Sequence, residues 1–281
     1  MRIIRSIKQM QKFAAQTKKC GKIIGFVPTM GYLHQGHLSL ARQAKKDADI
    51  VIMSIFVNPA QFGPKDDFKK YPRNLKQDCR LAKKAGVDII FYPAANEMYP
   101  ENYQTCVEVV ELSKPLCGRS RPGHFKGVTT VVVKLFNIVK PDIAYFGQKD
   151  AQQAVIIKQM VSDLNMDLKI KVMPIIREPG GLAASSRNAY FSSSQRKDAL
   201  VLKKALQEAV LMIKSDEKYE KNIIKAMKNI INSVSSSMID YIAIADAKTL
   251  KPAKHLKGDI LIALAVKIGK TRLIDNVQVH I

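Results

Sequence analysis

The residues with the clearest chemical potential are two histidines near the start of the chain. His34 and His37 stand three positions apart in the segment Pro28–His37, which follows an apolar run over Ile23–Val27. Side chains three apart share one side of a first helical turn. A helix N-terminus offers unpaired N–H groups and a partial positive charge that suit a phosphate. Two imidazoles beside a triphosphate, neutral or protonated, can donate hydrogen bonds where negative charge develops during transfer.

Glycines in the same segment favour close approach of the backbone to a ligand. Gly31 marks the turn, and Gly36 removes a side chain from between the two histidines. Two other interpretations remain open, namely a capped helix with surface histidines and half of a metal site. The remaining histidines show no ligand-like spacing; they are His124, His255 and His280. The sequence contains neither a Walker A motif nor a GxGxxG fingerprint, so a phosphate site would depend on the HxGH pattern.

The elements that must position this segment follow from the alternation of short apolar runs with amphipathic helical patterns. Strands are predicted at Ile23–Val27, Ile50–Val57, Val87–Tyr92, Ile143–Phe146 and Leu168–Ile176, and helices at Gly36–Lys46, Asn74–Ala85, Val128–Val139 and Asp150–Leu164. This alternation predicts an α/β fold with a Rossmann-like parallel sheet flanked by helices. In such sheets, ligands bind at the carboxyl ends of the strands.

The pattern changes after Arg177, where Glu178–Gly181 is a turn-rich break. Two amphipathic helices and three short strands are predicted beyond it, at Ser194–Lys214, Tyr219–Val234, Ile239–Ala245, Ile260–Lys267 and Val277–Ile281. We therefore predict two domains. Residues 1–176 would form the Rossmann-like domain, and residues 177–281 a smaller α+β domain.

Composition limits the class of protein. The 281 residues carry 46 Lys and Arg against 24 Asp and Glu, a net charge of +22, which raises nucleic-acid binding as an alternative function. The basic residues are scattered, however, and aromatics amount to 7% with no Trp, so no specific nucleic-acid binding is predicted. The longest apolar runs are of strand length, the N-terminus lacks a secretory signal, and the four cysteines show no CxxC spacing. A cytoplasmic protein without membrane association is predicted.

Further motifs occur in order along the chain: Phe56–Gly63, Tyr71–Arg73, Arg121–Val128, Phe146–Gln153 and Leu182–Asn188. With the HxGH segment they resemble the nucleotidylyltransferase superfamily and, more narrowly, the pantothenate synthetase (pantoate–β-alanine ligase) family, over essentially the whole chain. The resemblance implies an ATP-dependent ligase that adenylylates (R)-pantoate and then joins it to β-alanine, giving pantothenate, AMP and pyrophosphate. It also implies a place in coenzyme A synthesis, a requirement for Mg²⁺ and a homodimer.

The resemblance also implies roles for individual residues. His37, His34, Lys149 and Arg187 would be catalytic. Pantoate and β-alanine would lie against Gln61, and pantoate against Gln153, whose amide has donors and acceptors that suit a hydroxy acid. The ATP site would comprise Met30, Gly31, Tyr32, Leu33, His34, Gln35, Gly36, His37, Gly147, Gln148, Lys149, Asp150, Ile176, Ala184, Ser185, Ser186 and Arg187. The smaller domain would close over the site as a lid.

The chain departs from the family pattern at a few positions. Gly180, Gln148 and Ala151 stand where the family commonly has Asp, Glu and an aromatic residue. Of two adjacent acids after the Tyr-Pro-Arg motif, Asp78 remains beside Gln77, so Asp78 is the candidate metal ligand. An alternative function is that of another HxGH nucleotidylyltransferase, which transfers a nucleotide to a phosphate-bearing acceptor. That acceptor would require cations near Gln61 and Gln153, and the motifs there argue against it.

Overall fold

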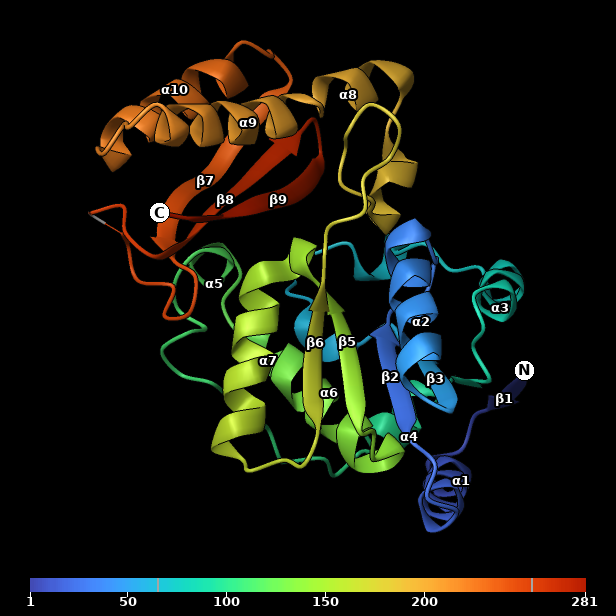
Figure 1. Cartoon of the computed structure of the whole chain (residues 1–281). Coiled ribbons are helices and arrows are strands. Elements are labelled where there is room, and N and C mark those ends of the chain that lie inside the picture. Colours follow the sequence, from blue (N-terminus) through green and yellow to red (C-terminus); the bar gives the residue numbers. More distant parts are fainter. Residues whose placement is uncertain (65, 254) are drawn as a thin grey trace.

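The computed structural model describes residues 1–64, 66–253 and 255–281, which form two sheets covered by helices (Figure 1). The larger sheet has six parallel strands in the order β1-β4-β3-β2-β5-β6. Its strands are β1 (Arg2–Ile4), β2 (Ile24–Thr29), β3 (Ile50–Ile55), β4 (Ile89–Phe91), β5 (Ile143–Gly147) and β6 (Lys169–Met173). The predicted Rossmann-like sheet is confirmed.

The central strands are apolar throughout because helices cover both faces of this sheet. Along β3, Ile52 belongs to the buried cluster that includes residues of α1 (Ile7–Lys19), α6 (His124–Val139) and α7 (Ala151–Asp163). The adjacent residues, Val51 and Met53, belong to the cluster on the other face, with α2 (Gln35–Asp47) and α3 (Leu75–Lys84). Successive strand residues point to opposite faces. The helices on both faces therefore hold the carboxyl ends of the strands in place, and the candidate site residues follow these ends.

The C-terminal part of the chain forms a three-stranded antiparallel sheet, β7-β8-β9, with helices on one face (Figure 1). Its elements are β7 (Ser237–Asp246), β8 (Asp259–Ile268), β9 (Thr271–His280), α8 (Ser193–Asp198), α9 (Val201–Lys214) and α10 (Glu220–Asn232). The predicted α+β character of this part is confirmed. The last strand begins earlier than the predicted Val277–Ile281. Its first residues were missed in the sequence because polar residues there alternate with apolar ones.

β8 connects the two parts of the molecule. Ile262 and Leu264 pack beneath α9 and α10, while Leu261 and Ala263 face the other way. This second set packs with Leu116 and Ala151 of the N-terminal part; the Leu116 and Ala151 side chains are buried. The apolar run in β8 is continuous because both of its faces are covered. The small side chain of Ala151 thereby lies directly at the contact between the two parts.

Several short elements complete the fold: η1 (Pro59–Gln61), η2 (Phe68–Lys70), α4 (Ala95–Met98), α5 (Cys117–Ser120), η3 (Gln148–Asp150) and η4 (Ser186–Tyr190). The sequence did not predict β1 or α1. The buried residues of α1 recur at helical spacing, at Met10, Ala14 and Thr17, so this helix was overlooked although its pattern is amphipathic. The single helix predicted at Ser194–Lys214 is wrong in one respect, since it is divided into α8 and α9.

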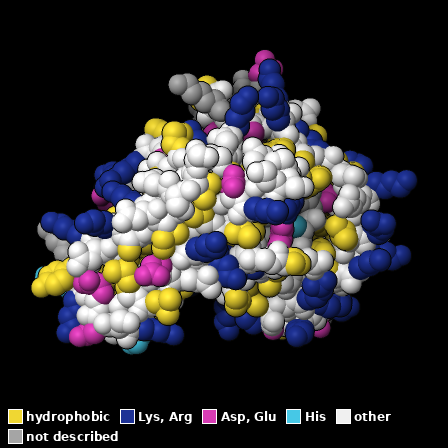
Figure 2. Space-filling view, turned by 90° about the horizontal axis from the view of Figure 1, so that it is seen from above, with side chains coloured by type: hydrophobic (Ala, Val, Ile, Leu, Met, Phe, Trp, Pro, Cys, Tyr) yellow, Lys and Arg dark blue, Asp and Glu magenta, His cyan; other side chains and the backbone are white. Residues whose placement is uncertain are grey.

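The basic side chains are distributed rather than gathered. Figure 2 shows Lys and Arg dispersed over the face above the C-terminal sheet, interspersed with apolar and polar side chains. No helix in the described part of the chain is long and apolar enough to cross a membrane.

Candidate active site

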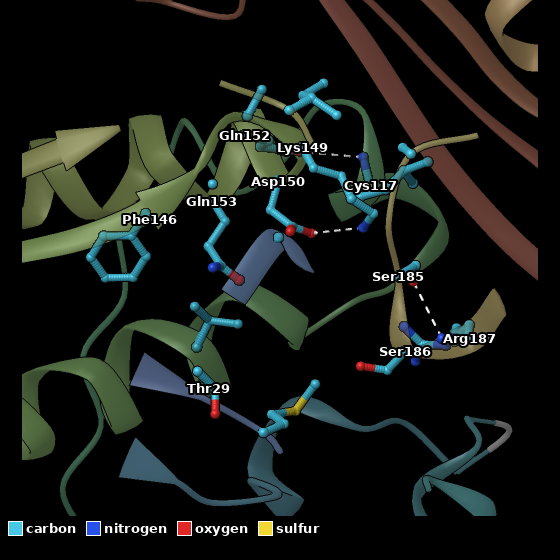
Figure 3. A pocket seen from close by; sticks show the side chains of 18 of the residues that line it. Thr29, Cys117, Phe146, Lys149, Asp150, Gln152, Gln153, Ser185, Ser186 and Arg187 are labelled. Atoms are coloured by element: carbon cyan, nitrogen blue, oxygen red, sulfur yellow. Dashed lines mark hydrogen bonds and ion pairs between the residues drawn. The ribbon is translucent and has the colours of Figure 1, made fainter. Parts of the chain in front are cut away.

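A cavity of about 280 Å³ lies between the carboxyl ends of β2 and β5 and the C-terminal sheet. β2 pairs with β3 on one side and with β5 on the other. The loops after β2 and β5 therefore diverge, which leaves a crevice at the point where the strand order reverses. Figure 3 shows Thr29, Gln153 and Arg187 around this cavity, each from a different segment of the chain.

The turn between β2 and α2 is held by a buried acid. One carboxylate oxygen of Asp78 accepts the N–H of Tyr32 at 2.9 Å, and the other accepts the N–H of Leu33 at 2.7 Å. Gly31 has φ +81°, and a Cβ there would lie 2.9 Å from the Ile55 side chain. Burial raises the pKa of Asp78, while the two N–H donors lower it. This carboxylate fixes the path of the HxGH segment.

The two histidines cap α2 reciprocally. The His34 Nδ1 accepts the N–H of Gly36 at 3.1 Å, and the His37 Nδ1 accepts the N–H of His34 at 3.4 Å. Their ring centroids lie 3.9 Å apart. A Cβ on Gly36 would lie 2.9 Å from the His34 ring, which explains the glycine between them. The helix-cap alternative is correct for the Nδ1 atoms, yet both rings line the cavity.

Capping also decides the protonation of these rings. Because each Nδ1 accepts a backbone N–H, the proton of the neutral ring lies on Nε2. Burial, then the neighbouring His37 and Lys149, lower the pKa of His34 to about 2. Burial and Lys149 lower the pKa of His37 to about 4. At neutral pH the structure therefore presents two uncharged Nε2–H donors.

Asn58 orients the amide of Gln61. The Asn58 Nδ2 donates to the Gln61 Oε1 at 3.1 Å and to the Gly127 carbonyl at 3.0 Å, while Tyr99 donates to the Asn58 Oδ1 at 2.7 Å. The Gln61 Nε2 then contacts the Met30 sulfur at 3.2 Å. Since its oxygen is engaged, Gln61 offers the cavity mainly N–H donors.

The backbone of Gln61 is held from a second side. His124 donates through Nδ1 to the Gln61 carbonyl at 2.8 Å, and Arg121 donates to the same oxygen at 3.3 Å. Arg121 also pairs with Asp66 at 2.8 Å. Burial and Arg121 lower the pKa of His124 to about 4. His124 therefore makes a structural hydrogen bond that holds the Gln61 backbone.

The turn after β5 carries Lys149 and is held by β9. The Asn276 Nδ2 donates to the carbonyls of Gln148 and Lys149 at 3.0 and 2.9 Å, and the Gln148 Nε2 donates to the Asn276 Oδ1 at 3.1 Å. The Lys149 ammonium lies 3.7 Å from the Asp150 carboxylate. Gln153 follows on α7, and its side chain makes no hydrogen bond within the described part of the chain (Figure 3).

The segment before α8 supplies a second cation. Ser186 donates to the Tyr32 carbonyl at 3.1 Å and so joins this segment to the HxGH turn. Arg187 forms a two-pronged ion pair with Asp67, at 3.0 Å from Nε and 2.7 Å from Nη2. The Ser185 hydroxyl accepts the N–H of Arg187 at 3.3 Å (Figure 3).

Most of the predicted site residues lie together in the cavity wall. These are Met30, His34, Gly36, His37, Gln61, Gly147, Lys149, Asp150, Gln153, Ile176, Ala184, Ser185, Ser186 and Arg187. Five of the predicted ATP-site residues are not in that wall: Gly31, Tyr32, Leu33, Gln35 and Gln148. Gly31 and Tyr32 border a second hollow behind the turn, and Gln148 faces Asn276.

Asp78, the predicted metal ligand, also lies outside the cavity wall, because its carboxylate is turned toward the backbone of the HxGH turn. Within the described residues, no three His, Cys, Asp or Glu side chains form a metal-binding group. The acids in the cavity wall are Asp150 and Asp275, and Asp275 is paired with Arg177 at 2.7 Å. This donor set fits an Mg²⁺ ion bound mainly by phosphate oxygens and water.

Sequence reasoning passed over several polar residues of the site. Asn58 was detectable, because it lies three residues after the end of the buried strand β3, at the edge of the sheet where ligands bind. Asp67 and Asn276 were not, since their partners lie 120 and 128 residues away. The departure at Gly180 has a conformational basis: its φ of +93° suits glycine.

Comparisons with known proteins agree along the whole chain. The family model described as pantoate-beta-alanine ligase matches residues 2–278. Pantothenate synthetases of Acetivibrio thermocellus and Fervidobacterium nodosum are 52% and 54% identical, each with 100% of both chains covered. The crystal structure of the Thermus thermophilus pantothenate synthetase is 39% identical, covers 100% of both chains and has a TM-score of 0.95.

A second solved structure carries ligands. The pantoate-beta-alanine ligase of Francisella tularensis, complexed with beta-gamma ATP and beta-alanine, is 37% identical over 99% of this chain and 97% of that one, with a TM-score of 0.81. Full-length matches of sequence and fold leave one assignment: the chain belongs to the pantoate–β-alanine ligase family.

Proposed function

We propose that the chain is an ATP-dependent ligase that condenses (R)-pantoate with β-alanine through a pantoyl-adenylate intermediate. One observation carries the proposal: two uncharged imidazoles, two glutamines and two cations line one cavity, where the strand order of the sheet reverses. These residues are His34, His37, Gln61, Gln153, Lys149 and Arg187. ATP supplies the adenylyl group.

In the first step, a pantoate carboxylate oxygen would attack the α-phosphorus, and the bond to pyrophosphate would break. Negative charge grows on the leaving phosphates, and the Nε2–H groups of His34 and His37 would donate hydrogen bonds to them. Because these rings are uncharged, they avoid the desolvation cost of a buried cation. Lys149 would meet the same charge as a compact cation. No covalent enzyme intermediate is needed, so positioning and charge stabilisation account for the catalysis.

The glutamines would select the acid. Gln61, with its oxygen held by Asn58, would donate to the pantoate carboxylate or hydroxyl, and Gln153 would use both ends of its amide on the hydroxyls. In the second step the β-alanine amine would attack the acyl carbon, releasing AMP. Transfer to a phosphate-bearing acceptor is disfavoured, because neutral amides stand where that acceptor needs cations.

Further proposals concern the surroundings of the site. Residues 1–176 would bind ATP and pantoate, and residues 177–281 would close over them and keep water from the adenylate. Mg²⁺ would be bound mainly by the ATP phosphates and would neutralise part of their charge. Asp150, an acid in the cavity wall, lies 3.7 Å from the Lys149 ammonium. We also propose a cytoplasmic homodimer without specific nucleic-acid binding.

The test is a product assay. Purified protein is incubated with Mg-ATP and (R)-pantoate, with and without β-alanine, and products are identified by mass spectrometry. Pantothenate and AMP are expected when all three substrates are present. Folded protein that forms neither product would refute the proposed function. Labelled ATP with a panel of phosphorylated acceptors tests the alternative nucleotidyl transfer.

A further inference from the structure

Arg187 is oriented by an acid from the other part of the chain. Asp67 lies just before η2, and its two oxygens accept from the Nε and Nη2 of Arg187 at 3.0 and 2.7 Å. The residues are 120 positions apart in sequence. Their side chains are 26% and 29% exposed, so this pair is shielded compared with an ordinary surface ion pair. A two-pronged contact fixes the plane of a guanidinium as well as its position.

Neighbouring contacts also join the segment that contains Asp67 to η4 (Ser186–Tyr190). The Arg187 guanidinium lies 5.8 Å from the centre of the Tyr71 ring. The Tyr190 hydroxyl donates to the Lys70 carbonyl at 3.0 Å. The segment that contains Asp67 is thus bound to η4 at both of its ends. The ion pair is held in one geometry by the surrounding structure.

The ion pair with Asp67 leaves the Nη1 edge of the Arg187 guanidinium available to a ligand. A guanidinium has five N–H donors, and the contact with Asp67 uses one on Nε and one on Nη2. The Nη1 group donates to no residue in the described ranges, 1–64, 66–253 and 255–281. Arg187 lies in the cavity wall. The donors that remain are those suited to a phosphate ligand.

We propose that Asp67 is a positioning residue for adenylation: it holds Arg187 so that its Nη1 edge meets the ATP phosphates. The inference depends on the proposed ligase function. Asp67 touches no substrate in this arrangement, and it acts through Arg187 alone. The adjacent acid serves a different part of the site, because Asp66 pairs with Arg121, which holds the Gln61 carbonyl.

The experiment compares the two half-reactions, because the proposed role of Asp67 concerns adenylation alone. Asp67→Asn removes the charge with little change in volume. Pyrophosphate release from ATP and pantoate is measured by rapid quench, and aminolysis is measured by adding β-alanine to preformed enzyme-bound adenylate. Pyrophosphate release is expected to slow roughly 10- to 100-fold, as for loss of a charge-assisted pair. Aminolysis is expected to stay within about twofold of wild type, since the β- and γ-phosphates have by then departed as pyrophosphate and only the α-phosphate remains in the adenylate.

Four further variants test the route through Arg187: Asp67→Glu, Arg187→Lys, the double variant and a surface control. Asp67→Glu retains the carboxylate and is expected to recover part of the rate. Asp67→Asn is expected to add no further loss in an Arg187→Lys background, because lysine cannot form the two-pronged contact. Asp216→Asn is the matched control, since Asp216 pairs with Lys218 on the exposed surface and lies outside the cavity wall.

The outcomes separate the inference from the function it depends on. Wild-type protein that forms no pantothenate refutes both. Active wild type with an Asp67→Asn variant that adenylates within about twofold of normal refutes the positioning role alone. Equal losses in both half-reactions, accompanied by a lower melting temperature, would show that Asp67 only stabilises the fold and would also refute it.

Discussion

The start of α2 and the contacts between the N- and C-terminal parts of the chain bring chemistry to the same cavity by different physical means. At α2, His34 and His37 are fixed by backbone groups within three residues of themselves. Lys149 and Arg187 instead depend on partners from the opposite part of the chain, Asn276 and Asp67.

This difference has consequences for dynamics. A helix cap forms with the helix itself, so the two Nε2–H donors are preorganised whether or not the C-terminal part is closed. The placement of the two cations, by contrast, rests on contacts between the two parts of the chain. Under the closure proposed for residues 177–281, correct placement of the two cations is linked to closure of the cavity, and damage to the two regions should look different in kinetics.

The largest effect should come from His37, where capping and donation can be separated. His37→Asn places an acceptor near the position of Nδ1 and preserves the cap, but it removes the Nε2–H donor. Adenylation should fall roughly 10²- to 10⁴-fold, the usual contribution of a positioned proton donor, while the melting temperature stays near wild type. His37→Gln keeps a donor near Nε2 and should retain more activity. Rapid-quench measurement of pyrophosphate release decides the matter, and equal rates for the two variants would contradict the separation.

The predictability of the site from sequence follows the same division. The HxGH segment was recognisable because a strand, glycines and a helix start are contiguous, and the parallel sheet because β2, β3 and β5 carry near-continuous apolar runs. The role of Asp78 was not, since an acid three residues into a helix gives no sign that it holds a turn 45 residues earlier. Packing between distant segments determines such contacts, and no local pattern encodes them.

Asp78 provides the next largest effect. Asp78→Ala would leave the buried N–H groups of Tyr32 and Leu33 without acceptors, at about 1–3 kcal/mol for each. The free energy of unfolding, measured with urea, should fall accordingly, and adenylation should fall with it as the HxGH turn moves. A variant of wild-type stability whose activity returns at high Mg²⁺ would instead support the predicted metal role of this carboxylate.

Asn276 should show a smaller effect from the opposite region. Asn276→Ala removes both N–H donors to the turn that carries Lys149. Adenylation should slow roughly 10-fold through loosened placement of the cation, with a higher KM for ATP. Steady-state kinetics with varied ATP measures this, and Gln278→Ala, at an exposed position on the same strand, is the comparison. If both variants are equally active, the orientation of Lys149 does not depend on β9.

The smallest effect concerns pH and returns to the caps of α2. Burial lowers the pKa of His34 to about 2, so the unfolded chain, with an ordinary pKa of 6.5, takes up a proton that the native state refuses. Native stability should therefore fall as pH decreases below 6.5. Between pH 7 and 5.5 the loss is at most about 1.3 kcal/mol for this histidine. His34→Asn keeps the acceptor for Gly36 but cannot titrate, so urea unfolding at both pH values should show a smaller loss in the variant. Asp78, whose pKa burial raises, acts in the opposite direction but equally in both proteins, and it cancels in the difference. Equal losses would mean that the His34 ring titrates in the native state as it does in the unfolded chain, so that burial would not hold it uncharged.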